Sequence, residues 1–170
     1  AYTGGGVFLF DEIDGSSAQA LLAFNAIAAN DLAAFPCGTV KRHEDFVLIA
    51  AANTYGNGAD AIHVGRSQLD AATLDRFAFI EMPYDEDMER AISPLEEWTR
   101  YVQTFRAKVA EHKMRHIVSP RASIAGGKLL AQGMSAKRVA DLVLFKSMTD
   151  ADRSKMPKVP NIKFKKAESV

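Results

Sequence analysis

The chain has 170 residues, no net formal charge at neutral pH and 48% hydrophobic residues, values typical of a soluble globular protein with one domain or two small ones. No apolar run approaches the ~20 residues that a transmembrane helix needs, and the first residues lack the basic start of a signal peptide. Cys37 is the only cysteine, which excludes an internal disulfide and favours a reducing compartment. We therefore expect a cytoplasmic protein with no membrane partner.

The zero net charge hides an uneven distribution of charge. Residues 1–90 carry 14 acidic and 5 basic side chains, a net −9, whereas residues 91–170 carry 7 acidic and 16 basic side chains, a net +9. Such a step indicates two structural units with a boundary near residue 90. The two surfaces either complement each other, or the basic surface faces a phosphate-bearing partner.

The first unit alternates predicted strands with predicted helices. Continuous apolar runs predict buried strands at residues 7–10 and 46–52, the first of them buried on both faces, and residues 77–82 are expected to form a third strand. Residue composition and periodicity predict helices at residues 18–29 and 69–75. This order is typical of crossover connections in a parallel sheet that is covered by helices. We therefore expect an α/β fold for this unit.

The second unit shows no strand pattern. Its predicted helices each start at a serine, in the segments Ser93-Pro94-Leu95-Glu96, Ser119-Pro120 and Ser135-Ala136. The first of these segments has the composition of a capping box with proline at the first helical position, and Gly133 is expected to end the second helix. We expect residues 91–148 to form a small helical domain. Residues 149–170 are expected to form a basic tail that is either loosely held or a stub leading to a removed segment, with its positive charge on Lys155, Lys158, Lys163, Lys165 and Lys166.

Three carboxylates follow the first predicted strand. Asp11 and Glu12 come directly after the apolar run, and Asp14 follows two positions later. In open α/β sheets, ligands bind at the carboxyl ends of the strands. In P-loop nucleotidases, a strand-end Asp helps to hold Mg²⁺, and a neighbouring acid can orient or deprotonate the attacking water. The run Val7-Phe8-Leu9-Phe10-Asp11-Glu12 resembles the Walker B motif of the AAA+ ATPases.

Two later segments continue this resemblance. Asn53 follows the second predicted strand, as the sensor 1 residue does in AAA+ proteins, and the resemblance implies that its amide holds the attacking water or the γ-phosphate. The segment Leu69-Asp70-Ala71-Ala72-Thr73-Leu74-Asp75-Arg76-Phe77 is similar to the L-x-x-A-x-x-D-R-F segment of the MoxR, McrB and midasin-like (dynein-related) branch. In that branch the arginine tends to lie at a subunit interface and to reach a neighbour's nucleotide.

The resemblance implies that Arg76 is an arginine finger, because its planar, permanently charged guanidinium matches phosphate oxygens. Arg66 is the second choice for this role. The alternative is a structural Arg76 that forms a salt bridge to Asp75 or Asp70 within its own chain.

The segment Ser119-Pro120-Arg121-Ala122 resembles the sensor 2 motif of the same branch, which implies that Arg121 contacts nucleotide from a helical lid. One family element is missing from the 170 residues, namely a P-loop, G-x-x-x-x-G-K-[ST]. Residues 122–129 contain Gly127-Lys128 but lack the first glycine and the final serine or threonine. The resemblance therefore implies a chain cut just upstream of Walker B.

In the family's sheet order, 5-1-4-3-2, such a chain keeps the third, fourth and fifth strands. The slot of the absent first strand would leave backbone groups unpaired. Either its neighbours close up, or another chain fills the slot, or the rest of the protein is a separate fragment.

Two further clusters are weaker candidates for sites. His112 and His116 have the spacing of a metal pair on one helix face, but Lys113 stands where a zincin motif has Glu, so a solvated basic face is the better interpretation. Residues 35–45 are expected to form a small hairpin before the second strand. Its Lys41-Arg42-His43 either grips a polymer in a ring pore, as loops in this region do in related proteins, or belongs to an ordinary polar loop.

The resemblance implies the carboxyl-terminal part of an AAA+ nucleotide-binding domain at residues 1–90, followed by a helical lid. In the intact protein it implies ATP hydrolysis with Mg²⁺ in a homo-oligomeric ring, most simply a hexamer, that remodels a protein or a nucleic acid. Asp11 would hold Mg²⁺ and Glu12 would activate water, and we expect the 170 residues alone to be inactive. The alternative is a non-catalytic ring or adaptor subunit that lacks a P-loop.

Overall fold

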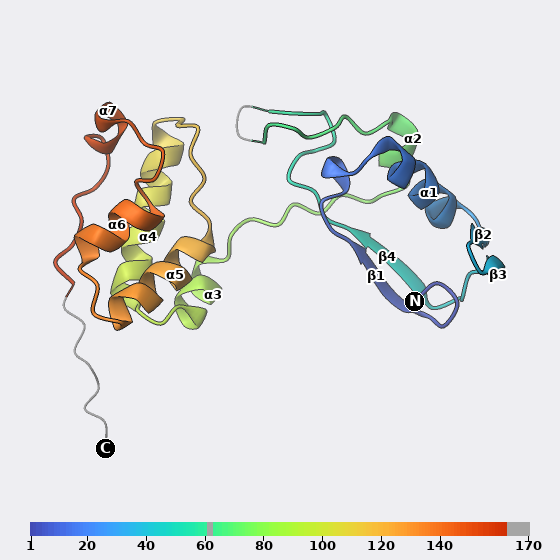
Figure 1. Ribbon diagram of the computed structural model, residues 1–170, viewed down its shortest axis with the longest axis horizontal. Coiled ribbons are helices and arrows are strands. Elements are labelled where there is room, and N and C mark those ends of the chain that lie inside the picture. Colours follow the sequence, from blue (N-terminus) through green and yellow to red (C-terminus); the bar gives the residue numbers. More distant parts are fainter. Residues whose placement is uncertain (61–62, 163–170) are drawn as a thin grey trace, which may run out of the picture. The chain divides into compact units, whose positions relative to one another are not determined.

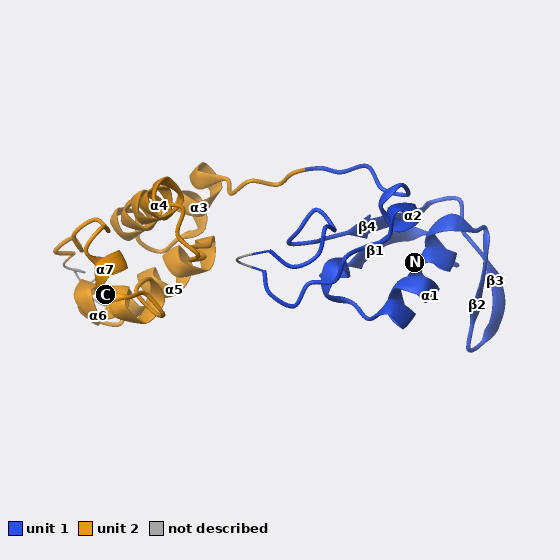
Figure 2. Ribbon diagram, turned by 90° about the horizontal axis from the view of Figure 1, so that it is seen from above, with its two compact units in different colours: residues 1–80 blue, residues 81–170 orange. Residues whose placement is uncertain are grey.

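The computed structural model describes residues 1–60 and 63–162, and the chain divides into two compact units, Ala1–Ile80 and Glu81–Val170 (Figures 1 and 2). The boundary predicted near residue 90 is therefore too late. The reason is that helix α3 (Glu86–Ile92) packs into the second unit, where Glu89 forms an ion pair of 2.8 Å with Arg106. The molecule is a mixed α/β protein with a small parallel sheet and several helices.

The parallel sheet of the first unit consists of strands β1 (Gly6–Phe10) and β4 (Phe46–Ala50). The strands are in register from the pair Gly6 and Phe46 to the pair Phe10 and Ala50, and Figure 1 shows them side by side. Both strands were predicted, although β4 ends two residues earlier than expected.

The third predicted strand, at residues 77–82, is wrong. These residues belong to no helix or strand, and the side chains of Phe79, Ile80 and Met82 are exposed. A strand needs a neighbour that pairs with its backbone groups. Within the described residues, β1 and β4 pair only with each other, so the segment does not close onto β4.

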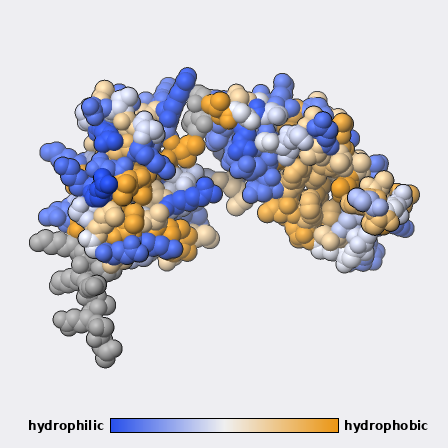
Figure 3. Space-filling model, viewed as in Figure 1, coloured by the Kyte–Doolittle hydropathy of each residue, from blue (hydrophilic) through white to orange (hydrophobic). Residues whose placement is uncertain are grey.

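One face of the sheet is covered and the other is open. Helix α1 (Ala18–Ala29), which was predicted with these bounds, packs Phe24 against Phe10 with a centroid distance of 4.5 Å. The opposite face carries Val7, Leu9, Val47 and Ile49, which are between 47% and 61% exposed. Figure 3 shows apolar residues gathered over these strands. The expected burial of the first strand on both faces is therefore wrong, because no described element covers its second face.

The predicted hairpin is present but begins earlier in the chain. Strands β2 (Leu32–Phe35) and β3 (Gly38–Lys41) pair antiparallel around Pro36-Cys37. The ring of Tyr2 lies against Phe35 and Phe46 and connects the hairpin to the sheet. Helix α2 (Ala71–Leu74) begins after Asp70, whose side chain accepts a hydrogen bond from the backbone N–H of Thr73.

The second unit is helical and surrounds one apolar core. Besides α3 it contains α4 (Glu96–Glu111), α5 (Pro120–Ala131), α6 (Ala136–Val143) and α7 (Asp150–Arg153). The most buried side chains of this core, at most 1% exposed, are Trp98, Val102, Phe105, Leu130, Val139, Ala140 and Leu144. As predicted, the backbone turns at Gly133 after α5, and Ser135 caps α6. No helix within residues 1–60 and 63–162 has the length and apolar character needed to cross a membrane.

Two predictions for this unit need correction. Helix α4 starts at Glu96 without a capping box, because Ser93 ends α3 and its hydroxyl accepts a hydrogen bond of 2.6 Å from Thr99. The part of the tail from residue 149 to residue 162 is held in place, because Met156 and Ile162 are buried in the helical core. Tyr101 donates a hydrogen bond to the carbonyl oxygen of Pro157, and burial raises the pKa of Tyr101 to about 12. The last three lysines named for the tail, Lys163, Lys165 and Lys166, lie outside the described residues.

Candidate functional site

The predicted acidic pair lies at the carboxyl end of β1 and is exposed to solvent. Asp11 Oδ1 accepts a hydrogen bond of 2.9 Å from the backbone N–H of Glu12. Glu12 has a φ of 54°, in the left-handed region that residues with a β-carbon rarely adopt, and its side chain is 63% exposed. The chain therefore makes a strained turn directly at the two carboxylates, of the kind that clusters at functional sites.

Asp14 behaves quite differently from its two acidic neighbours. Its side chain is completely buried in a 3₁₀ turn, Ile13–Gly15. Its Oδ2 accepts three hydrogen bonds from the turn after β4, from Asn53 N (3.2 Å), Thr54 N (3.0 Å) and Thr54 Oγ1 (2.8 Å). The Asp14 carboxylate thus connects the ends of both parallel strands.

Asn53 is brought close to the acidic turn by its backbone. Its N–H bonds to Asp14, and the backbone of the preceding strand end pairs with the same turn, since Ile13 N donates to Ala51 O at 3.0 Å. The side chain of Asn53 is exposed, and no described residue forms a hydrogen bond with its amide. The structure therefore places Asp11, Glu12 and Asn53 at one edge of the sheet, with their side chains accessible to a ligand.

Arg66 also joins this edge. Its Nη1 donates to Glu12 Oε2 at 3.3 Å and to Asp14 Oδ1 at 3.4 Å, and its side chain is only 17% exposed. The hydrogen bond to Glu12 is the main reason that the pKa of Arg66 is raised. Gly15 makes room for this contact, because a β-carbon on Gly15 would lie 2.4 Å from Arg66 Nη1. Arg66, the second choice for the arginine finger, is thus bound to two carboxylates of its own chain in this structure.

Arg76 follows helix α2 and is exposed. Its guanidinium donates a hydrogen bond to the carbonyl oxygen of Ala72, and it forms no ion pair within the described part of the chain. Asp70 instead bonds to Thr73, which is the main reason that the pKa of Asp70 is lowered, with a smaller contribution from the charge of Arg76. The salt bridge to Asp70 or Asp75 that was the alternative role for Arg76 is thus absent from this structure.

Arg121 lies in the helical unit, whereas the other candidate residues lie in the α/β unit. It occupies the first turn of α5, is exposed, and has no hydrogen-bonding or ionic partner among the described residues. Its guanidinium is free to bind an anion. Its predicted contact with nucleotide stays a prediction.

No group of three or more His, Cys, Asp or Glu side chains in the described ranges is arranged to hold a metal ion. Mg²⁺ does not require such a cage, because it commonly binds through one or two carboxylates together with substrate phosphates and water. The exposed Asp11, with Oδ2 free of hydrogen bonds from described residues, fits this mode. The predicted histidine spacing does not create a helical pair, because α4 ends at Glu111 and His116 Nε2 bonds to Leu144 O at 2.7 Å.

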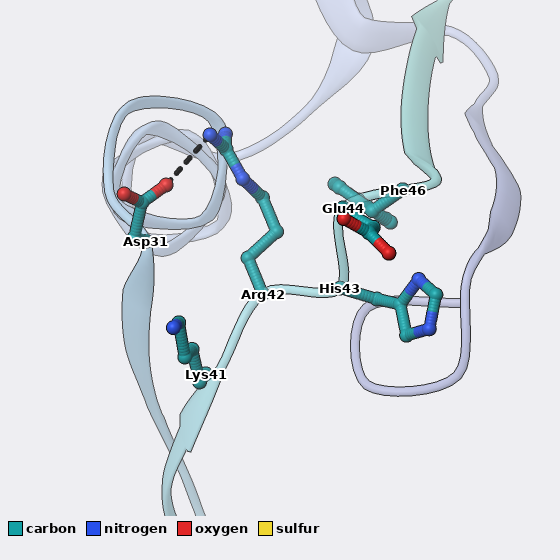
Figure 4. A pocket seen from close by; sticks show the side chains of 6 residues that line it. All are labelled: Asp31, Lys41, Arg42, His43, Glu44 and Phe46. Carbon is teal, nitrogen blue, oxygen red and sulfur yellow. Dashed lines mark hydrogen bonds and ion pairs between the residues drawn. The ribbon is translucent and has the colours of Figure 1, made fainter.

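The loop after β3 forms an open pocket of about 590 Å³ beside the hairpin (Figure 4). It is lined by charged and aromatic side chains, namely Asp31, Lys41, Arg42, His43, Glu44 and Phe46. Arg42 is held by Asp31 at 2.7 Å, whereas Lys41 forms no ion pair with a described residue. Whether the loop grips a polymer stays a prediction.

The sequence analysis missed two features of the site. Asp14 is buried and accepts hydrogen bonds from the turn after β4, and Arg66 pairs with this buried carboxylate. The only local signal was the short spacing from Glu12 to Asp14-Gly15, in which a glycine next to an acid permits a close approach. Comparison with known proteins found no matching family model and no matching curated protein.

Proposed function

We propose that this chain supplies the metal-binding and water-activating side of an ATP-hydrolysing site of the AAA+ type, in the MoxR, McrB and midasin-like branch. The observation that carries the proposal is the common sheet edge at which Asp11, Glu12 and Asn53 meet. Exposed carboxylates and an exposed amide at the ends of parallel strands are the groups that such a hydrolysis needs.

The proposed roles follow from the exposure and the partners of each group. Asp11 would hold Mg²⁺ through its free oxygen, and the metal, when bound, would supply positive charge for the phosphates. Glu12 takes a proton from the attacking water. The Asn53 amide donates a hydrogen bond to the γ-phosphate or orients the water. The two exposed arginines, Arg76 and Arg121, neutralise phosphate charge, Arg76 in the site of a neighbouring subunit and Arg121 in its own.

The proposal also requires a cradle for the phosphates. Backbone N–H groups of a glycine-rich loop and its lysine normally provide one, and the 170 residues contain no such motif. The proposed enzyme is therefore a full-length protein in which a P-loop accompanies these residues, assembled as a homo-oligomeric ring, with six subunits as the simplest case. Its work is the remodelling of a protein or a nucleic acid.

The test replaces Glu12 by glutamine in the full-length protein. The amide keeps the shape of the side chain but cannot accept the proton, so the Glu12→Gln variant should bind ATP with unchanged affinity and lose nearly all turnover. Glu81→Gln is the matched control, because Glu81 is exposed and forms no ion pair with a described residue. Turnover of Glu12→Gln at the level of this control would refute the proposal. ATP binding without turnover by the unsubstituted protein would favour the non-catalytic subunit instead.

A further inference from the structure

We propose that Asp14 is a positioning residue that fixes Asn53 with one carboxylate oxygen and, through Arg66, Glu12 with the other. The inference rests on the proposed function, because it assigns Asp14 a role in the same site. It goes beyond that function by naming a residue that touches neither nucleotide nor metal and yet sets the geometry of two groups that do.

The first step concerns the cost of burying a charge. A fully buried carboxylate is unfavourable unless its oxygens are hydrogen-bonded. Asp14 meets this requirement with donors that lie 39 and 40 positions away in the chain, at Asn53 and Thr54. These three hydrogen bonds hold the turn after β4 against the turn after β1. The backbone from which the Asn53 amide projects is therefore anchored to the acidic turn itself.

The second step concerns the other oxygen of Asp14. Oδ1 lies 3.4 Å from Arg66 Nη1, and the same nitrogen lies 3.3 Å from Glu12 Oε2. The backbone supports this arrangement, because Ser67 N donates to Asp14 O at 2.7 Å and places the neighbouring Arg66 beside the turn. The buried acid thus orients the arginine, and the arginine restrains the exposed Glu12.

The third step separates positioning from simple stabilisation. The three donors from the turn after β4 need only an acceptor oxygen, which a neutral amide also provides. The negative charge of Asp14 is needed only for the ion pair with Arg66, because a guanidinium pairs with a carboxylate and not with an amide N–H₂ group. Replacing Asp14 by asparagine therefore keeps an acceptor for the Asn53–Thr54 turn and removes the charge that holds Arg66.

The experiment measures nucleotide affinity and single-turnover hydrolysis in the full-length protein. Asp14→Asn should reduce the rate of hydrolysis by about 10- to 100-fold, the effect of a small misplacement of a reacting group, while the affinity for ATP stays within about twofold because no phosphate contact is lost. Asp141→Asn is the matched control, since Asp141 is also paired with an arginine, Arg153, at 3.2 Å, but belongs to helix α6 of the helical unit. It should leave the rate unchanged.

A second variant tests the same link without altering Asp14. In Gly15→Ala, the new methyl group would displace the Arg66 guanidinium and should lower the rate in the same way. Gly4→Ala is its control, because nothing lies within 4 Å of a β-carbon at Gly4. This variant decides the question if Asp14→Asn does not fold.

The outcomes distinguish this inference from the proposed function. If Glu12→Gln abolishes turnover while Asp14→Asn and Gly15→Ala hydrolyse ATP as fast as their controls, Asp14 is only structural and the inference is wrong. A lower rate in both variants that is matched by an equal loss of affinity for ATP also contradicts it. Full turnover in Glu12→Gln would overturn the proposed function, and this inference with it.

Discussion

The two units of the molecule are held together by different kinds of interaction. In the helical unit, the largest fully buried side chains are mainly apolar, with Trp98 and Phe105 at the centre. In the described α/β unit, the fully buried side chains are Asp14 and Thr73, both polar, and the most buried apolar side chain, Ile13, is still 3% exposed. The helical unit thus has a closed core of its own. The α/β unit instead has one open sheet face, and one of its two fully buried side chains, Asp14, lies in the candidate site.

The largest loss of stability should come from truncating a side chain in the closed core of the helical unit. Phe105→Ala should lower the free energy of unfolding of the helical unit by about 3–5 kcal/mol, because the ring is fully buried and packs on Phe145 at 5.3 Å. Chemical denaturation followed by Trp98 fluorescence measures this loss. Phe79→Ala is the control in the α/β unit, where the ring is 58% exposed, and should change stability by less than about 0.5 kcal/mol. Equal losses in both variants would remove the contrast between the units.

A smaller loss is expected where helix α5 packs against Trp98 of helix α4. A β-carbon on Gly126 would lie 2.2 Å from Trp98 Nε1, which donates a hydrogen bond to Ala122 O. Alanine normally favours a helix over glycine, but here the overpacking should dominate and Gly126→Ala should cost about 1–3 kcal/mol. Thermal unfolding followed by circular dichroism tests the sign. A stabilised variant would show that α4 and α5 are packed less closely than the structure indicates.

The helical unit should also respond to acid through one buried carboxylate. Burial raises the pKa of Glu89, but hydrogen bonds from Arg106 and Ser123 lower it more, so the net pKa in the folded state lies below the ordinary value of 4.5. The resulting stabilisation is complete above pH 4.5 and is lost as the pH falls through the lower, folded-state pKa.

Denaturation curves between pH 6 and pH 3 measure this dependence on acid. Glu89→Gln should be less stable than the parent at pH 6 and should have a flatter pH dependence. A parent protein whose stability does not fall with acid would contradict the role given to Glu89.

The smallest effect is expected on the open face of the sheet. Val7→Thr should change the stability of the chain by less than about 0.5 kcal/mol, because Val7 is 61% exposed and threonine suits a strand equally well. Urea denaturation of the purified chain measures this change. A loss above 2 kcal/mol would show that this face is covered in solution, and the comparison between the two units would then need revision.

How well the sequence predicted each element depended on whether its signal was local. Helix α1 and the Ser135 cap of α6 were predicted because propensity and capping residues lie within the elements themselves. The strand expected at residues 77–82 failed because a strand also needs a neighbour. The tail was mispredicted because its polar composition hid Met156 and Ile162, two apolar side chains that reach the core.

The candidate site shows the same limit. The spacing of Asp11, Glu12 and Asn53 relative to apolar runs correctly indicated that they follow neighbouring parallel strands. The burial of Asp14 could not be predicted, because its partners lie between 39 and 52 positions away. The role of Arg76 was left with an alternative for a similar reason, since two nearby aspartates offered a salt bridge that the structure does not contain.

The most direct test of the account mixes two inactive variants of the full-length protein. Arg76→Ala keeps an intact acidic pair but presents no arginine to its neighbour, and it should lose about 10³–10⁵ in turnover, as loss of an arginine finger does. Glu12→Gln presents the arginine but cannot activate water. Mixed rings should regain ATPase activity at interfaces where an intact Glu12 faces an intact Arg76. Mixed rings that assemble normally and stay inactive would contradict the account.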